Sequence, residues 1–71
     1  MHTLVEMDPC IIGKRLRELR GTKARSEVAT DLGISCSALA MYEQGERIPR
    51  DNIKIKIANY YGQSISAIFY A

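Results

Sequence analysis

The sequence predicts a single all-α domain of five short helices, and three observations support this prediction. The chain has 71 residues, which is enough for one small domain. Apolar residues recur at intervals of three and four along most of the chain, which is the spacing of one helix face. Glycine follows four such segments and proline opens two, as is usual at helix ends; the residues are Gly21, Gly33, Gly45 and Gly62, and Pro9 and Pro49.

The first three helices are expected at Pro9–Arg20, Arg25–Leu32 and Cys36–Gln44. Asp8 can cap the first and Ser35 the third, because their side-chain oxygens accept hydrogen bonds from the free N–H groups of a helix start. The second helix has no such cap, since Ala24 precedes it. The inner faces of the three helices are expected to carry Ile12, Leu16 and Leu19, then Val28, Ala29 and Leu32, then Leu39 and Tyr42.

The fourth segment fits two different patterns. Ile53–Ile57 alternates isoleucine with lysine like a strand, yet the apolar residues at 53, 57, 60 and 61 keep helical spacing. A lone strand has no partner among four helical segments. We therefore predict a helix over Asp51–Tyr61, which leaves Ile55 off its inner face. The last helix is expected at Ser64–Tyr70, with Ser64 as its cap.

The remaining composition favours a soluble cytoplasmic protein. Residues 1–8 are expected to form a flexible tail before a domain at 9–71. Cys10 and Cys36 are far apart in sequence and His2 is the only histidine, so we expect free thiols and no metal site. The chain has no signal peptide and no apolar run of about 20 residues that spans a membrane. We also expect no cofactor.

Charge and motif content favour binding over catalysis. The sequence contains no nucleophile–base pair, no paired carboxylates suited to a cleft and no glycine-rich phosphate loop, so an enzyme is not expected. The net charge is only +2, but basic residues concentrate in 11–25 and 47–56 with an acidic stretch between. Two basic blocks can fold into one basic face for nucleic acid, or they can belong to a mixed solvated surface. The charge pattern leaves both open.

The strongest local pattern covers residues 25–44. Counted from Arg25, Ala29 is at position 5, where two helices that cross at about 90–120° nearly touch. Gly33 is at position 9, where the turn needs a left-handed backbone that glycine adopts without steric cost. Apolar residues occupy the seam between the helices, at Val28, Leu32, Ile34, Leu39 and Tyr42. Apolar spacing alone also fits any helical hairpin.

The stretch EVATDLGISCSALAMYEQGERIP resembles the Cro/CI-type (XRE) helix-turn-helix family. The family pattern is TQ-x-x-LA-x-x-LG-V-S, a variable helix, then Y-E-x-G-x-x-x-P, and the matches here are Val28-Ala29, Leu32-Gly33-Ile34-Ser35, Tyr42-Glu43, Gly45 and Pro49. IGKRLRELR and ANYYGQSISAIF resemble the family's first and closing helices, so the resemblance covers residues 11–69. The chain departs from the pattern at Ala24-Arg25, where the family has Thr-Gln, and the connection before it looks short.

The resemblance implies a five-helix λ-repressor-like domain whose third helix lies in the major groove of DNA. The residues that would face base edges are Cys36, Ser37, Ala40 and Met41. None of these is Arg, Asn or Gln, so direct base readout should be modest and DNA shape should carry more of the specificity. Phosphate contacts would come from Arg25, Gln44, Arg47 and Arg50. The family also pairs a first-helix arginine with the Glu of Y-E, which implies a clamp between Arg20 and Glu43; the alternative is an exposed Glu43 of little energetic value.

The function expected on this basis is a sequence-specific transcriptional regulator. A recognition helix reads few base pairs, so we expect a homodimer on a palindromic operator, acting as a repressor or autoregulator of a phage, mobile element or small operon at the nucleoid. Its dimer interface is expected on the last helix, at Ile65, Ile68, Phe69 and Tyr70, with Ile55 at the edge. The alternative is a protein-interaction module, such as an antitoxin, whose partner is a toxin or antirepressor.

Overall fold

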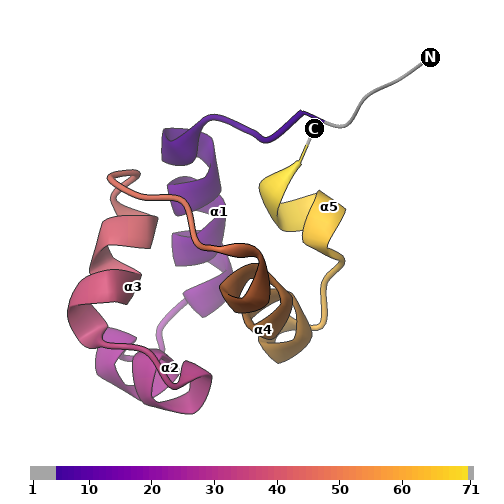
Figure 1. The fold of residues 1–71 in the computed structure, drawn as a ribbon. Helices are drawn as coiled ribbons and strands as arrows, with labels where there is room; N and C mark the ends of the chain where they lie inside the picture. The colour runs from indigo at the N-terminus through magenta and orange to yellow at the C-terminus, as the bar shows by residue number, and fades with distance from the viewer. Residues whose placement is uncertain (1–4, 71) are drawn as a thin grey trace.

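The computed structural model describes residues 5–70 and contains five helices (Figure 1). Their bounds are α1 Pro9–Arg20, α2 Arg25–Leu32, α3 Cys36–Glu43, α4 Asp51–Tyr61 and α5 Ile65–Phe69. The predicted all-α fold is confirmed, and α3 and α5 are slightly shorter than expected. The alternating Ile53–Ile57 segment is helical, as predicted. The extended pairing within residues 5–70 is limited to one isolated antiparallel bridge, between Glu6 and Tyr70.

The helix starts follow the local chemistry of the sequence. Asp8 accepts a hydrogen bond from the backbone N–H of Cys10 at 2.8 Å and so caps α1. Ser35 caps α3 and Ser64 caps α5 in the same way, through the N–H groups three residues later. Ala24 makes no side-chain cap for α2. The predicted caps of α1, α3 and α5 are confirmed, and within residues 5–70 α2 begins without a side-chain cap.

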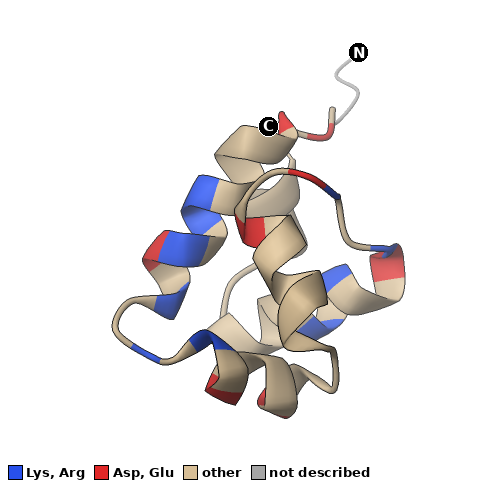
Figure 2. Ribbon diagram, turned by 90° about the vertical axis from the view of Figure 1, so that its left-hand side faces the viewer, with Lys and Arg blue, Asp and Glu red and all other residues tan. Residues whose placement is uncertain are grey.

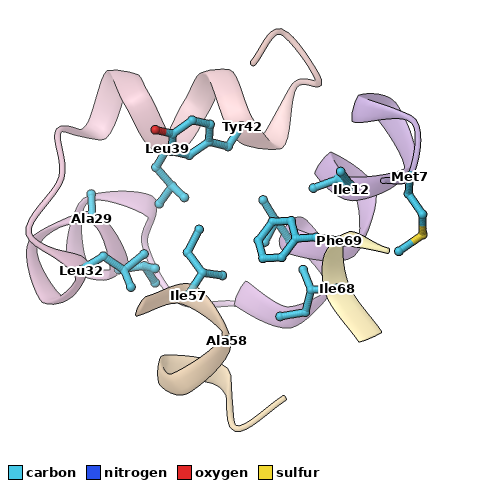
Figure 3. Packing of buried hydrophobic residues seen from close by; sticks show 12 residues of the cluster. Met7, Ile12, Ala29, Leu32, Leu39, Tyr42, Ile57, Ala58, Ile68 and Phe69 are labelled. Atoms are coloured by element: carbon cyan, nitrogen blue, oxygen red, sulfur yellow. The ribbon is translucent and has the colours of Figure 1, made fainter. Parts of the chain in front are cut away.

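All five helices contribute to one hydrophobic core (Figure 3). Phe69 of α5 and Ile57 of α4 are completely buried, and their side chains point toward the centre between the helices. Ile12 from α1 and Leu39 from α3 are each 1% exposed and belong to the same core. Because Ile68 is also buried, α5 buries most of its apolar surface within the monomer.

The segment before α1 is packed against the domain. Met7 is buried, and its N–H donates to the carbonyl of Phe69 at 2.8 Å. The Glu6 carboxylate binds the ammonium group of Lys54. The tail predicted over residues 1–8 therefore needs a correction, because the packed domain begins before Pro9, where Met7 fills the space beside α5. Residues 1–4 lie outside the described part of the chain.

Lys54 is a buried charge on the inner side of α4. Its Nζ donates to Glu6 and, at 3.0 Å, to the hydroxyl of Tyr70. It also lies 5.7 Å from the ring centre of Phe69, which favours a cation over the ring face. Burial by itself lowers the pKa of Lys54, but the hydrogen bonds with Glu6 and Tyr70 outweigh it, and the pKa is raised. The helix thus turns Lys54 inward and leaves Ile55 48% exposed.

The backbones of α1 and α3 touch at Gly13. A Cβ atom at this position would lie 2.4 Å from the carbonyl oxygen of Glu43 and 2.9 Å from that of Tyr42. Both atoms belong to the backbone, so they cannot move aside cheaply. Glycine here sets the distance between α1 and the end of α3. A glycine within a helix normally costs stability relative to alanine, and this contact is the reason it is tolerated.

We expect Gly13→Ala to destabilise the domain by about 3 kcal/mol or more, because the added methyl group forces α1 away from α3. Helix propensity alone predicts the opposite sign, a gain of about 1 kcal/mol. Urea unfolding followed by circular dichroism measures the change. Lys14→Ala is the matched control on the exposed side of α1 and should alter stability by less than about 0.5 kcal/mol. A Gly13→Ala variant as stable as the control would show that the two backbones do not touch.

Candidate nucleic-acid interface

The turn between α2 and α3 has the geometry that the sequence pattern predicts. Gly33 adopts a left-handed conformation with φ of +70°, and its N–H donates back to the carbonyls of the last turn of α2. Ile34 N–H donates to the Ala29 carbonyl at 3.0 Å, which closes the end of the helix. Ala29 is 2% exposed, so the two helices pack closely at this small side chain. The turn therefore holds α3 at a defined angle across α2.

α3 presents a continuous outer stripe of small and uncharged side chains. Leu39, Tyr42 and Glu43 are buried on its inner side. The outer stripe follows at helical spacing, with exposed residues near the start of the helix and half-buried ones in its middle. It consists of Cys36, Ser37, Ala40 and Met41, the four residues predicted to face bases, and Gln44 follows it at the exposed helix end. The stripe is thus available to a ligand that lies along α3.

Basic residues lie on both sides of this stripe. Figure 2 looks onto α3, whose ribbon carries almost no charge, while Lys and Arg segments, interspersed with Asp and Glu, lie on α1 and α2 on one side and on α4 and the loop before it on the other. Arg47 and Arg50 are exposed in the connection from α3 to α4. The uncharged stripe thus lies between two flanks of mixed charge, which include the exposed Arg47 and Arg50.

Cys10 and Cys36 are both free and exposed. Among residues 5–70, no three His, Cys, Asp or Glu side chains gather closely enough to hold a metal ion. In the same part of the chain, the helices are too short and too polar for any of them to cross a membrane.

The buried carboxylate of Glu43 connects the first three helices. Its side chain is completely buried. The Arg20–Glu43 pair implied by the resemblance is present, with Nε of Arg20 2.7 Å from Oε2 and Nη2 3.1 Å from Oε1. Arg17 donates to the backbone carbonyl of Glu43. The hydrogen bonds with Glu43 raise the pKa of Arg20. A buried charge of this kind is destabilising unless it is paired and hydrogen-bonded, and here it is both.

Arg25 also binds Glu43, which the sequence did not predict. Its Nε donates to Oε1 of Glu43 at 3.1 Å, so the carboxylate receives two arginines, one from α1 and one from the first residue of α2. The side chain of Arg25 remains 34% exposed. Arg25 was expected at a phosphate, and in the free protein it is held by Glu43. The one signal of this contact in the sequence is that arginine stands at position 25, where the family pattern has glutamine.

Tyr60 and Tyr61 of α4 lie near the cluster formed by Arg20, Arg25 and Glu43, and the two tyrosines differ in their hydrogen bonding. The Tyr60 hydroxyl donates to Asp31 at 2.7 Å and accepts from Lys23 at 3.0 Å. The Tyr61 hydroxyl is buried and makes no hydrogen bond within residues 5–70. Burial, reinforced by the charge of Glu43, raises the pKa of Tyr61 to about 12. Tyr61 therefore stays protonated in the folded protein well above the range in which a free tyrosine ionises.

The residues predicted for a dimer interface divide into two groups. Ile68 and Phe69 are 1% and 0% exposed and belong to the core of the monomer, so a second copy cannot reach them. Ile65 and Tyr70 are half-buried and line a groove of about 270 Å³. The groove also includes the exposed Ile55. The apolar surface near the C-terminus is therefore smaller than predicted, and it involves α4 as well as α5.

Comparison with known proteins agrees with this geometry. A family model described as helix-turn-helix matches residues 14–68. Among solved structures, the chain is similar to the solution structure of the SOS-response transcriptional repressor LexA from Eubacterium rectale. The TM-score is 0.81 at 22% sequence identity, over 86% of this chain and 67% of that one. No curated protein sequence matches significantly.

We expect Tyr61→Phe to stabilise the domain at neutral pH, by up to about 1 kcal/mol, because it removes a buried hydroxyl that has no partner. The raised pKa adds a pH dependence. Stability that comes from keeping Tyr61 neutral is complete below the ordinary tyrosine pKa of 10.0 and is lost as the pH rises toward 12. The advantage of the Phe variant should therefore grow between pH 10 and 12.

Urea unfolding at neutral and alkaline pH measures both effects. Tyr60→Phe is the matched control, since its hydroxyl bonds to Asp31, and it should be destabilising at neutral pH. A Tyr61→Phe variant that loses as much stability as the Tyr60 control would show that the Tyr61 hydroxyl does have a partner.

Proposed function

This chain belongs to the XRE-type helix-turn-helix family of DNA-binding transcriptional regulators, and on that premise we propose that it is a dimeric, sequence-specific regulator that reads DNA with α3. The observation that carries the proposal is the uncharged outer stripe of α3, which is exposed at its start, half-buried in its middle and followed by the exposed Arg47 and Arg50. As the finer assignment we propose a repressor or autoregulator of a phage, mobile element or small operon acting at the nucleoid, as the resemblance to the family implies.

Base recognition in this proposal relies on short side chains. The Ser37 hydroxyl can donate or accept a hydrogen bond at a base edge or a phosphate. Ala40 and Met41 offer apolar contact, for which the methyl group of thymine is the natural counterpart. Cys36 contributes a small side chain at the start of the helix. Because none of these makes a bidentate contact to guanine or adenine, the shape and flexibility of the DNA should contribute much of the specificity.

Phosphate contacts in this proposal come from the flanks of the stripe. Arg47 and Arg50 are exposed in the connection from α3 to α4, and Gln44 is exposed where α3 ends. Arg25 would add a contact from the start of α2. These groups fix the position of α3 on the duplex without reading sequence. They also make binding depend on salt, since each neutralised phosphate releases counterions.

A dimer would supply the affinity that one short helix lacks. Two copies on a palindromic operator place their recognition helices one DNA turn apart, about 34–36 Å. We propose that the interface forms at the groove lined by Ile55, Ile65 and Tyr70. Ile55 is the exposed apolar residue of this groove, which Asp51 and Lys54 also line. A two-fold axis brings the same surface of each copy into contact, so Ile55 would be buried in the dimer.

A protein-interaction module, such as an antitoxin that binds a toxin or a domain controlled by an antirepressor, is the second candidate. The observation that favours it is the same stripe, because Ala40 and Met41 are half-buried and apolar and no Arg, Asn or Gln accompanies them among the base-facing positions. The two candidates differ in one measurable property, since only the first requires binding to duplex DNA that is selective for sequence.

The decisive measurement is selection of bound duplexes from a random pool, followed by titration of matched and scrambled duplexes across a salt series. We expect Arg47→Ala to weaken binding to both duplexes equally and to lower the salt dependence by about one counterion. Met41→Gln should change the preferred sequence toward adenine and leave the salt dependence nearly unchanged. If the unmodified protein prefers no sequence over the scrambled duplex, the interaction-module function replaces this proposal.

The dimer can be tested with two isoleucines of equal exposure. Ile55 is 48% exposed beside the groove, and Ile11 is 49% exposed on α1. We expect Ile55→Glu to shift the protein to monomer in sedimentation velocity at high micromolar concentration, because a buried unpaired charge is strongly unfavourable at an interface. Ile11→Glu should leave the dimer intact. A purely monomeric unmodified protein, or equal effects of both variants, would contradict the proposed interface.

A further inference from the structure

The arginines around Glu43 differ in how much of each guanidinium group is used. Arg20 donates through Nε and Nη2 to the Glu43 carboxylate and through Nη1 to the Lys23 carbonyl at 2.8 Å. Its side chain is 18% exposed. All three nitrogens of Arg20 are therefore engaged inside the protein. Arg20 is a structural clamp, and little of it remains for a ligand.

Arg25 is engaged at one nitrogen only. Its Nε donates to Oε1 of Glu43, and within residues 5–70 its two Nη atoms make no hydrogen bond. About a third of the side chain is exposed, compared with about a sixth for Arg20. Arg25 is also the first residue of α2. The Nε edge of its guanidinium is thus held by a buried carboxylate, while its two Nη groups have no partner within residues 5–70.

We infer that Glu43 is a positioning residue for DNA binding, which holds Arg25 through Nε so that its Nη groups are presented to a DNA phosphate. This inference rests on the proposed function. The planar guanidinium has donors on more than one edge, so one arginine can bind a carboxylate and a phosphate at the same time. A side chain already fixed by Glu43 loses less conformational freedom when the phosphate arrives.

The charges in the cluster are consistent with this role. Two guanidinium groups share the single carboxylate of Glu43, so the trio of Arg20, Arg25 and Glu43 keeps one net positive charge. Arg20 is enclosed, so the remaining charge is accessible at Arg25. A phosphate diester carries one negative charge and accepts two parallel N–H donors from an arginine. The cluster would then be neutral in the complex.

Replacement of Glu43 by glutamine distinguishes a positioning role from simple electrostatics, because the two predict opposite changes in the affinity for duplex DNA. Glu43→Gln removes a negative charge near the DNA, so electrostatics alone predicts tighter binding to any duplex. If Glu43 positions Arg25, binding becomes weaker by about tenfold, the effect expected for loss of one charge-assisted contact. In an Arg25→Ala background the same replacement should no longer weaken binding.

Arg25→Lys provides the second test and leaves the Arg20–Glu43 clamp in place. Lysine keeps the charge but has a single ammonium group, which cannot bridge Glu43 and a phosphate with the geometry of a planar fork. We expect Arg25→Lys to bind DNA nearly as weakly as Arg25→Ala. Arg15→Lys is the matched control, because Arg15 donates to the Ala67 carbonyl on the α5 side of α1. It should bind within about twofold of the unmodified protein, since surface changes of this kind have small effects.

The experiment measures the fluorescence anisotropy of a labelled mixed-sequence duplex with all six proteins, including the double variant, across a salt series, below each melting temperature found by circular dichroism. Weaker binding of Glu43→Gln that disappears in the Arg25→Ala background supports the inference, as does weak binding of Arg25→Lys. Unchanged or tighter binding of Glu43→Gln, together with normal binding of Arg25→Lys, overturns it while leaving the proposed function intact. If Glu43→Gln does not fold, Arg25→Lys decides alone. Failure of the unmodified protein to bind the duplex refutes the proposed function itself.

Discussion

The close contact of α1 with the end of α3 is the constraint on which the rest of this domain depends. Gly13 allows the two backbones to touch at Glu43, whose carboxylate is completely buried. A carboxylate in that position must be paired, so α1 supplies Arg20 and α2 supplies Arg25. One steric contact and one buried charge therefore set the positions of α1, α2 and α3 relative to one another.

This arrangement has a direct consequence for the outer side of α3. Because Leu39, Tyr42 and Glu43 are fixed inward, the opposite stripe from Cys36 to Gln44 must face outward. The same arginine that neutralises Glu43 reaches the surface at the start of α2 beside this stripe. Stability and the proposed DNA contact thus share a side chain. The guanidinium group of Arg25 forms the ion pair with Glu43, and in the proposal the same group also binds a phosphate.

A second buried charge organises the opposite end of the domain. Lys54 lies under the segment before α1 and binds Glu6 and Tyr70, so it joins the two ends of the described chain to α4. Met7 fills the adjacent part of the core and bonds to the backbone of Phe69. The groove proposed for a second copy borders this lysine. The shape of that groove consequently depends on the N-terminal segment as well as on α4 and α5.

The sequence by itself determined the features that local chemistry controls. Helix positions, the caps Asp8, Ser35 and Ser64, and the left-handed turn at Gly33 were predicted correctly, because each depends on residues within one or two turns. Apart from the Arg20–Glu43 pair, which the family resemblance implied, only the tertiary structure decided which charges are paired in the interior. Arg25 and Glu43 are 18 residues apart and Glu6 and Lys54 are 48 apart, so no local pattern links them. Their burial, like the packing of Met7 and of Phe69, follows from how the helices fill the core, and that depends on all five helices together.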